Sequence, residues 1–201
     1  MKTTLTITTF IAALFLAGCA STPQITRVSS DTQTDLSGYW NDTDVRIVCE
    51  SLINESLSSP RIAQFKKNTG NLPVFIVGTF RNDSDEHIDT SIITNKMQTA
   101  ILNSGKAEFV AGKGDRGEIR DERTDQQSQA SEDTAKAIGN ETGADFMLIG
   151  SVKTIVDKAG KFSTRTYFVY ADLINVETNT IIWKGENNEI KKVIKTPSTK
   201  F

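Results

Sequence analysis

The chain has 201 residues, of which 23 are Lys or Arg, 25 are Asp or Glu and one is His, and its formal net charge is -2. This length predicts one domain, with or without a tail. A nearly neutral charge excludes electrostatic capture of nucleic acid or of an anionic membrane as the main function. One His and two Cys leave most zinc sites without enough ligands. The composition therefore disfavours most enzyme classes.

The N-terminus is typical of an exported protein. An apolar run from Leu5 to Ala17 is too short to cross a hydrocarbon core of about 30 Å as a helix. It ends in Leu16-Ala17-Gly18-Cys19, which resembles the bacterial lipobox. The resemblance implies cleavage before Cys19, acylation of Cys19 and, because Ala20 follows, sorting to the outer membrane. Residues 1–18 are thus expected to be a lipoprotein signal peptide.

Residues 19–35 are predicted to be a lipidated, flexible tether. They are rich in Ser, Thr, Gln and Asp, and beyond Ala their aliphatic residues are Ile25 and Val28. Such a composition cannot bury enough apolar surface to order itself. Fully extended, the tether reaches at most about 55 Å. We therefore expect the domain, over residues 36–201, to stay close to its membrane.

The domain is predicted to open with a helix that Asn41 or Asp42 caps. Its apolar positions recur at helical spacing and fall at Val45, Val48, Cys49, Leu52 and Ile53 or Leu57. Because Cys49 lies in this stripe, it is interpreted as a buried, inert thiol. A short turn from Arg61 to Lys67 is expected to bury Ile62 and Phe65.

A strand, a second helix and a short strand follow. Residues 73–80 form a nearly continuous apolar run, which predicts a central strand covered on both faces. Asp89 or Thr90 is expected to cap a helix that stops at Gly105. Its inward positions are predicted to be Ile92, Ile93, Met97, Ala100 and Ile101. A short strand is expected over residues 107–110.

Residues 112–134 are almost wholly polar and predict a solvated helix. A further helix is expected near Ser131 to Asn140, since the residues at its start resemble a capping box. The charged face of residues 112–134 is open to two interpretations. It is either a simple solvated surface or a surface that docks a partner.

The last third of the chain is rich in β-branched and aromatic residues. Strands are predicted over residues 144–157, 162–176 and from residue 181 towards Val193, with turns at residues 159–160 and 177–180. This spacing is typical of a β-meander. Together with the earlier elements it predicts an α/β or α+β domain with one layered sheet.

Several patterns were considered as chemical sites. Residues 112–117 match GxGxxG, but the helix that follows lacks the apolar face that a dinucleotide fold needs. Asp83, Asp85, His87 and Asp89 alternate as in a calcium loop, but the loop has no Gly at its sixth position. His87 could serve as a catalytic base, yet no nucleophile stands beside it in a suitable turn. The favoured interpretations are a flexible turn at residues 112–117, a loop without calcium at residues 83–89, and His87 as a loop residue that donates to the backbone. Trp40 and Trp183 are likewise expected to be core or rim residues.

Four separated motifs resemble the penicillin-binding protein activator LpoB family, over roughly residues 35–195. In chain order these are Asp35-Leu36-Ser37-Gly38-Tyr39-Trp40-Asn41-Asp42-Thr43-Asp44, Val77-Gly78-Thr79-Phe80-Arg81-Asn82 running on to Glu86-His87-Ile88-Asp89-Thr90, Gly143-Ala144-Asp145-Phe146, and Thr180-Ile181-Ile182-Trp183-Lys184-Gly185-Glu186.

The resemblance implies an outer-membrane lipoprotein with a single TolB N-terminal-like α/β domain. Such a protein binds the small docking domain of a bifunctional class A penicillin-binding protein and stimulates peptidoglycan synthesis. It implies no catalytic residue, cofactor or metal, and its docking residues cannot be assigned from the motifs. Known members have a long Pro-rich tether, whereas this one is short and holds one Pro, Pro23.

Two alternatives stay open at this stage. The first is a structural or assembly lipoprotein of the outer membrane, similar to a curli-pore subunit, which predicts rings or higher oligomers. The second is a secreted hydrolase that uses His87, which predicts that activity depends on this side chain.

Overall fold

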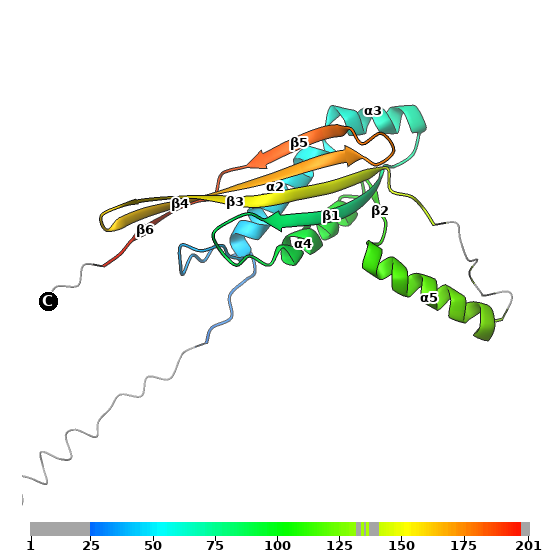
Figure 1. Cartoon of the computed structure of the whole chain (residues 1–201), viewed down its shortest axis with the longest axis horizontal. Coiled ribbons are helices and arrows are strands. Elements are labelled where there is room, and N and C mark those ends of the chain that lie inside the picture. The colour runs from blue at the N-terminus through cyan, green and yellow to red at the C-terminus, as the bar shows by residue number, and fades with distance from the viewer. Residues whose placement is uncertain (1–24, 132–133, 135, 137–140, 198–201) are drawn as a thin grey trace, which may run out of the picture. The chain divides into compact units, whose positions relative to one another are not determined.

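The computed structural model describes residues 25–131, 134, 136 and 141–197 (Figure 1). The chain divides into two units, and the larger unit begins at Gln33 and holds the core. Cys19 and the signal peptide lie outside the described residues. The proposed division at residues 18 and 35 therefore stays a prediction.

The first helix, α2 (Asp42–Leu57), begins where the sequence predicted. The side chain of Asn41 accepts a hydrogen bond from the backbone of Asp44, and the Asp44 side chain accepts one from the backbone of Asn41. This reciprocal pair satisfies two helix-end donors. The apolar stripe is buried as predicted, and Val48 and Leu52 are fully inaccessible to solvent.

Two further helices have clear stop signals. Helix α3 (Pro60–Thr69) begins after the cap Ser59 and ends at Gly70, and helix α4 (Thr90–Ser104) begins after Asp89 and ends at Gly105. Both glycines adopt the left-handed conformation that favours a residue without Cβ. Their predicted inward residues are buried or packed on the core, with one exception.

The exception is Ile92, which the sequence analysis placed inward. It is 55% exposed, whereas Ile93, Met97 and Ile101 are fully buried. The prediction was wrong because a helix turns 100° per residue, so adjacent Ile92 and Ile93 cannot both face a narrow core.

The described strands form one mixed six-stranded sheet in the order β2-β1-β3-β4-β5, with β6 paired to β4. Strand β1 (Val74–Asn82) lies parallel to β2 (Glu108–Phe109) and to β3 (Phe146–Ala159). Strands β3, β4 (Phe162–Asn175) and β5 (Ile181–Asn187) are antiparallel and form the predicted meander. The fold is thus the expected mixed α/β arrangement, one sheet packed with helices.

The last strand departs from the predicted meander. Strand β6 (Lys191–Lys195) pairs with the first half of β4, and β5 pairs with the second half. The two strands therefore lie along the same edge of β4, because β4 is long enough to accommodate both. The single long strand that the sequence suggested from residue 181 is divided between them.

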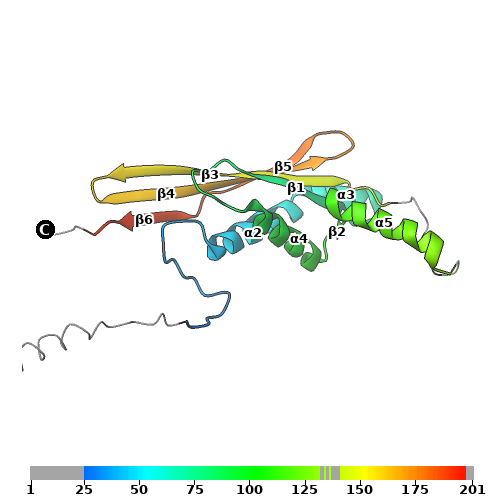
Figure 2. The same cartoon turned by 60° about the horizontal axis from the view of Figure 1, so that its bottom comes forward.

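The core lies between the sheet and the helices α2 and α4, on one face of the sheet (Figure 2). Phe75, Val77 and Leu148 point into it, while Met147 and Ile149, on the other face, are only half-buried. No helix of the described residues packs on Met147 and Ile149. The expectation that residues 73–80 are covered on both faces is therefore half wrong. The apolar run is continuous because Ile76 pairs with Met147 on that second face.

The polar segment forms helix α5 (Lys113–Gln129), which buries none of its residues. This confirms the predicted solvated helix. The further helix expected over residues 131–140 falls mostly outside the described residues. Among the described helices, none is both long and apolar enough to cross a membrane.

Candidate functional site

A polar network on the core side of the sheet joins the N-terminal segment, the loop after β1 and strand β4. At its centre is Glu86, whose side chain is 7% exposed. One carboxylate oxygen, Oε1, accepts hydrogen bonds from Arg165 Nη1 and from Tyr167 Oη, each at 2.5 Å. The other, Oε2, accepts from the backbone nitrogen of Trp40 at 3.0 Å. A single carboxylate thus ties together three segments that are far apart in the sequence.

Arg165 is the cation of this network. Its guanidinium also donates to Asp85 at 2.7 Å and stacks over the ring of Tyr39, with 5.1 Å to the centroid. Burial by itself disfavours the charged form of Arg165, but the carboxylates of Glu86 and Asp85 raise its pKa. The pKa of Asp85 is lowered, chiefly by the hydrogen bond from Thr154 and also by Arg165.

Tyr167 closes the network from the core side. Its ring is fully buried and packs on Trp40, with 5.1 Å between ring centroids. Burial, reinforced by the hydrogen bond to Glu86, raises the pKa of the Tyr167 phenol well above its ordinary value. The phenol therefore stays a neutral hydrogen-bond donor.

A second ion pair anchors the start of α2. Lys192 Nζ lies 2.7 Å from Asp44 Oδ2, 3.0 Å from Asp35 Oδ1 and 2.8 Å from the carbonyl oxygen of Tyr39. Burial raises the pKa of Asp44, and Lys192 opposes this shift in part. The hydrogen bond from Lys192 lowers the pKa of exposed Asp35. The N-terminal segment is thus attached to both β6 and α2.

Beside this network lies a groove of about 620 Å³. Its lining comes from the segment before α2, the first turn of α2, the loop after β1 and the first turn of α4. The residues are Tyr39, Trp40, Asn41, Asp42, Val45, Asp85, Glu86, His87, Ile88, Asp89 and Ile92. Tyr39 and Ile92 are 59% and 55% exposed. Apolar side chains exposed together beside a hollow are typical of a binding surface.

The rim of the groove is acidic. Asp42 and Asp89 are exposed at the first turns of α2 and α4, and Asp85 and Glu86 lie between them. Arg165 offsets only part of this charge. Two helix N-termini also lie here, but acidic residues already offset their positive dipole ends, Asp42 and Asp44 in the first turn of α2 and the cap Asp89 before α4. The groove therefore favours a cationic or neutral ligand over an anion.

Trp40, which lines the groove, has an unsatisfied donor. The indole Nε1 of Trp40 is buried, and no acceptor among the described residues reaches it. A buried donor without a partner is costly.

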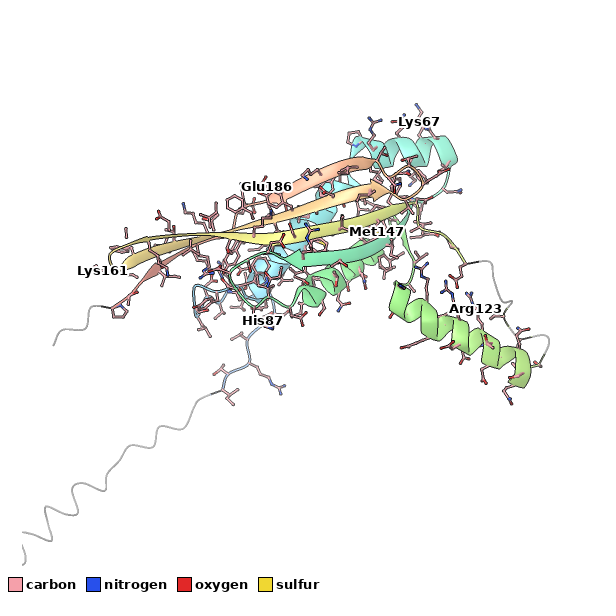
Figure 3. The ribbon with its side chains drawn as sticks, in the orientation of Figure 1. Lys67, His87, Arg123, Met147, Lys161 and Glu186 are labelled. Carbon is pink, nitrogen blue, oxygen red and sulfur yellow. The ribbon has the colours of Figure 1, made fainter. Side chains whose placement is uncertain are left out.

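The loop considered as a calcium site or as the location of a catalytic base has another use. Asp85 binds Arg165 and Thr154, and Asp89 caps α4 by accepting from the backbone of Ser91. Within the described part of the chain, no group of metal-ligating side chains is assembled. His87 is exposed in the groove wall, in the view of Figure 3 at the lower edge of the sheet.

The structure also locates the GxGxxG match, Cys49 and the two tryptophans. Gly112 caps α5, and the positions of Gly114 and Gly117 are surrounded by open space. The GxGxxG match therefore lacks the close packing that a dinucleotide site requires. Cys49 is buried, as predicted, and burial raises the pKa of its thiol to about 12, which favours the unreactive protonated form. Trp40 and Trp183 pack against the core as expected.

Sequence analysis missed the central role of Glu86 and Arg165. Arg165 lies in a strand whose other buried residues are aliphatic or aromatic, and this break in the pattern was the available signal. A charged residue at an inward strand position needs a buried partner, but the sequence does not say which carboxylate supplies it.

Comparison with known proteins gives the context of this geometry. The LpoB C-terminal domain from Escherichia coli is 17% identical, with a TM-score of 0.46, and the match covers 71% of this chain and 96% of that one. For the LpoB C-terminal domain from Salmonella enterica the identity is 18%, the TM-score 0.43 and the coverage 76% and 99%.

Lipoprotein GNA1162 from Neisseria meningitidis is 13% identical, with a TM-score of 0.35, and the match covers 64% of this chain and 87% of that one. Comparison with curated proteins finds no significant match. The family model described as peptidoglycan-synthase activator LpoB matches residues 44–189. The match spans more than half of the sequence, and the chain therefore belongs to the LpoB family of peptidoglycan-synthase activators.

Proposed function

We propose that this protein is an outer-membrane lipoprotein that binds and activates a bifunctional class A penicillin-binding protein. The family match over residues 44–189 carries the proposal. The lipobox adds the anchor, because its Cys19 would be acylated after removal of residues 1–18. Residues 19–35 then form the tether, and the domain faces the periplasm.

The activator acts without a catalytic residue of its own. Activation requires that the protein bind the active state of the synthase more tightly than the inactive state, since equal affinity would shift no equilibrium. The groove beside Trp40 is the proposed contact. Its exposed apolar side chains and its acidic rim suit a segment that carries both basic and apolar side chains.

The activity is tested by glycan polymerisation. We expect that adding the protein to a purified class A synthase, both in detergent or in vesicles, raises the rates of polymerisation and crosslinking. The matched control is the same synthase with its docking domain deleted, which should keep its basal rate and lose the stimulation. Unchanged rates together with no binding to the synthase would refute the proposal.

The anchor is tested separately by mass spectrometry of the exported protein. Cys19 should carry the acyl chains, and Cys19→Ser should abolish both acylation and co-fractionation with the outer membrane. Cys49→Ser is the matched control, because Cys49 is the other cysteine of the chain and is buried in the domain. Acyl chains on the Cys19→Ser variant would overturn the assignment of Cys19.

A further inference from the structure

The end of the sheet farthest from α3 carries an exposed apolar surface. Ile155 of β3, Phe162 of β4 and Val193 of β6 are 60%, 46% and 69% exposed. Their registers place them together, because Ile155 is opposite Thr166, and Thr164, two residues along β4, is opposite Val193. Directly paired residues and those two apart on a strand project from the same face of a sheet. The three side chains therefore form one patch, on the face opposite the core.

Lysines surround this patch. Lys153 is opposite Phe168, Lys191 is opposite Thr166 and Lys195 is opposite Phe162, all on the same face. A further lysine, Lys161, lies at the hairpin turn, which Figure 3 shows at the tip of the long β3–β4 hairpin.

We call Ile155, Phe162 and Val193 together with Lys153, Lys191 and Lys195 the hairpin-end patch. Within the described residues none of its lysines forms an ion pair. Lys195 and Lys161 lie over the Phe162 ring, each 5.8 Å from its centroid. Asp157 is the carboxylate on the same face at this end of the sheet, whereas Asp172 and Glu186 lie farther along that face, so the patch is locally cationic in a chain whose net charge is -2.

The N-terminal segment of the domain is attached at this end of the sheet. Lys192 of β6 pairs with Asp35, 3.0 Å apart, and donates to the carbonyl oxygen of Tyr39. Gly38 approaches Ile194 so closely that a Cβ at Gly38 would lie 2.0 Å from the Ile194 side chain. The proposed tether therefore ends beside β6, so the anchor connects to the domain at this end of the sheet, and a reach of at most about 55 Å allows this end to approach the membrane.

We propose that the hairpin-end patch binds the anionic phospholipid surface of the membrane in which the protein is anchored. The inference rests on the proposed acylation of Cys19. Each lysine near an anionic lipid surface raises the affinity for that surface roughly fivefold. Exposed apolar side chains enter the boundary between headgroups and acyl chains. Lipid is favoured over an acidic protein surface, because the anchor connects to the domain at this end of the sheet. Bound in this way, the domain would have one fixed orientation on the membrane.

The test uses the full, acylated protein in vesicles. An environment-sensitive fluorophore is attached at Val193→Cys and, as a matched control, at Ile92→Cys on α4, which is 55% exposed and outside the patch. Native Cys49 does not compete for the label, because it is buried and its thiol pKa is raised to about 12. Vesicles contain either phosphatidylcholine alone or phosphatidylcholine mixed with phosphatidylglycerol.

We expect the probe at position 193 to shift to the blue only with phosphatidylglycerol, and the probe at position 92 to keep its spectrum. High salt, or Lys153→Gln with Lys191→Gln and Lys195→Gln, should reduce the shifted fraction at least tenfold, since the attraction is electrostatic. A probe at position 193 that stays in water on these vesicles would overturn the proposal. So would a shift that appears only when a synthase docking domain is added.

Failure of acylation is a separate result. Intact mass and flotation with the vesicles report the anchor directly, whatever the fluorophore shows. A chain that is acylated and floats but keeps position 193 in water refutes the patch alone. A chain that carries no acyl group refutes the anchor, and the patch proposal falls with it.

Discussion

Arg165 and Glu86 lie 79 residues apart in the sequence, yet Nη1 of Arg165 is 2.5 Å from Oε1 of Glu86. Their side chains are 11% and 7% exposed, so water screens the pair only weakly. The contact holds the loop after β1 against strand β4. Because Glu86 also accepts from the backbone of Trp40, the same contact positions one wall of the groove.

Removing the carboxylate charge of Glu86 should destabilise the fold. In Glu86→Gln the buried guanidinium of Arg165 keeps, among the described residues, only exposed Asp85 as a counter-charge. We expect the free energy of unfolding to fall by about 3 kcal/mol, as when a buried ion pair loses one partner. Equilibrium unfolding in urea measures the change. Glu50→Gln, on the exposed side of α2, is the control and should alter stability by less than about 0.5 kcal/mol. Equal effects of the two changes would contradict the buried role of Glu86.

The pH dependence of stability should report Tyr167. Its phenol pKa is raised in the folded protein from an ordinary value of 10.0. A raised pKa means that the stabilisation is present below about pH 10 and is lost as the pH rises further, since the unfolded chain then releases a proton that the folded chain keeps. We expect the free energy of unfolding to fall above pH 10, with a contribution from Tyr167 of about 1.4 kcal/mol per pH unit.

Tyr167→Phe should remove that contribution. The variant loses stability at neutral pH, because Glu86 loses a buried donor, but its stability should fall less steeply above pH 10. Denaturant unfolding at a series of alkaline pH values gives both slopes. Identical slopes in the two proteins would show that the phenol is not protected from ionisation.

A Cβ at Gly150 should not fit in the sheet. It would lie 2.3 Å from the carbonyl oxygen of Tyr170 and 2.3 Å from the Phe80 ring. Gly150→Ala must therefore displace the paired strand, and we expect a loss of about 1–3 kcal/mol in the free energy of unfolding. Gly117→Ala is the matched control, because that position in α5 is open. It should raise helix content, measured by circular dichroism, without lowering the unfolding midpoint. An unchanged midpoint for Gly150→Ala would mean that the strands are less closely packed there.

The groove can be tested with two residues of the same helix. Ile92 and Leu102 both lie on α4 and both are 55% exposed, but only Ile92 lines the groove. If the groove docks the synthase, Ile92→Ser should weaken binding about tenfold or more, as expected for an apolar contact near the centre of an interface. Leu102→Ser should leave binding unchanged.

Binding to the purified synthase and stimulation of glycan polymerisation are the measurements. Loss of both with Ile92→Ser alone supports the groove as the contact. Equal binding by both variants and the unaltered protein would place the contact elsewhere on the domain, while leaving the activator function intact.

Local patterns in the sequence predicted most elements because their causes are local. Asn41 and Asp89 begin helices because their side chains accept hydrogen bonds from backbone N–H groups of the first turn. Gly105 ends a helix because it adopts the left-handed conformation at the last turn. The place of Ile92 was wrong, since periodicity does not tell how wide the buried face is. The pairing of β6 with β4 was also missed, because strand partners are chosen by the length and free edge of a distant strand.

The sequence by itself determined the mixed α/β class, the buried position of Cys49, the solvated α5 and the motifs that resemble the family. These follow from periodicity, capping residues and composition, which act over a few residues. Only the tertiary structure decided that Glu86 meets Arg165, that a groove forms beside Trp40 and that lysines gather around Val193. Each of these groupings joins residues from separate elements. The net charge of the chain does not reveal a local cluster of charges. Their positions are set by strand register and helix packing, which depend on the whole fold.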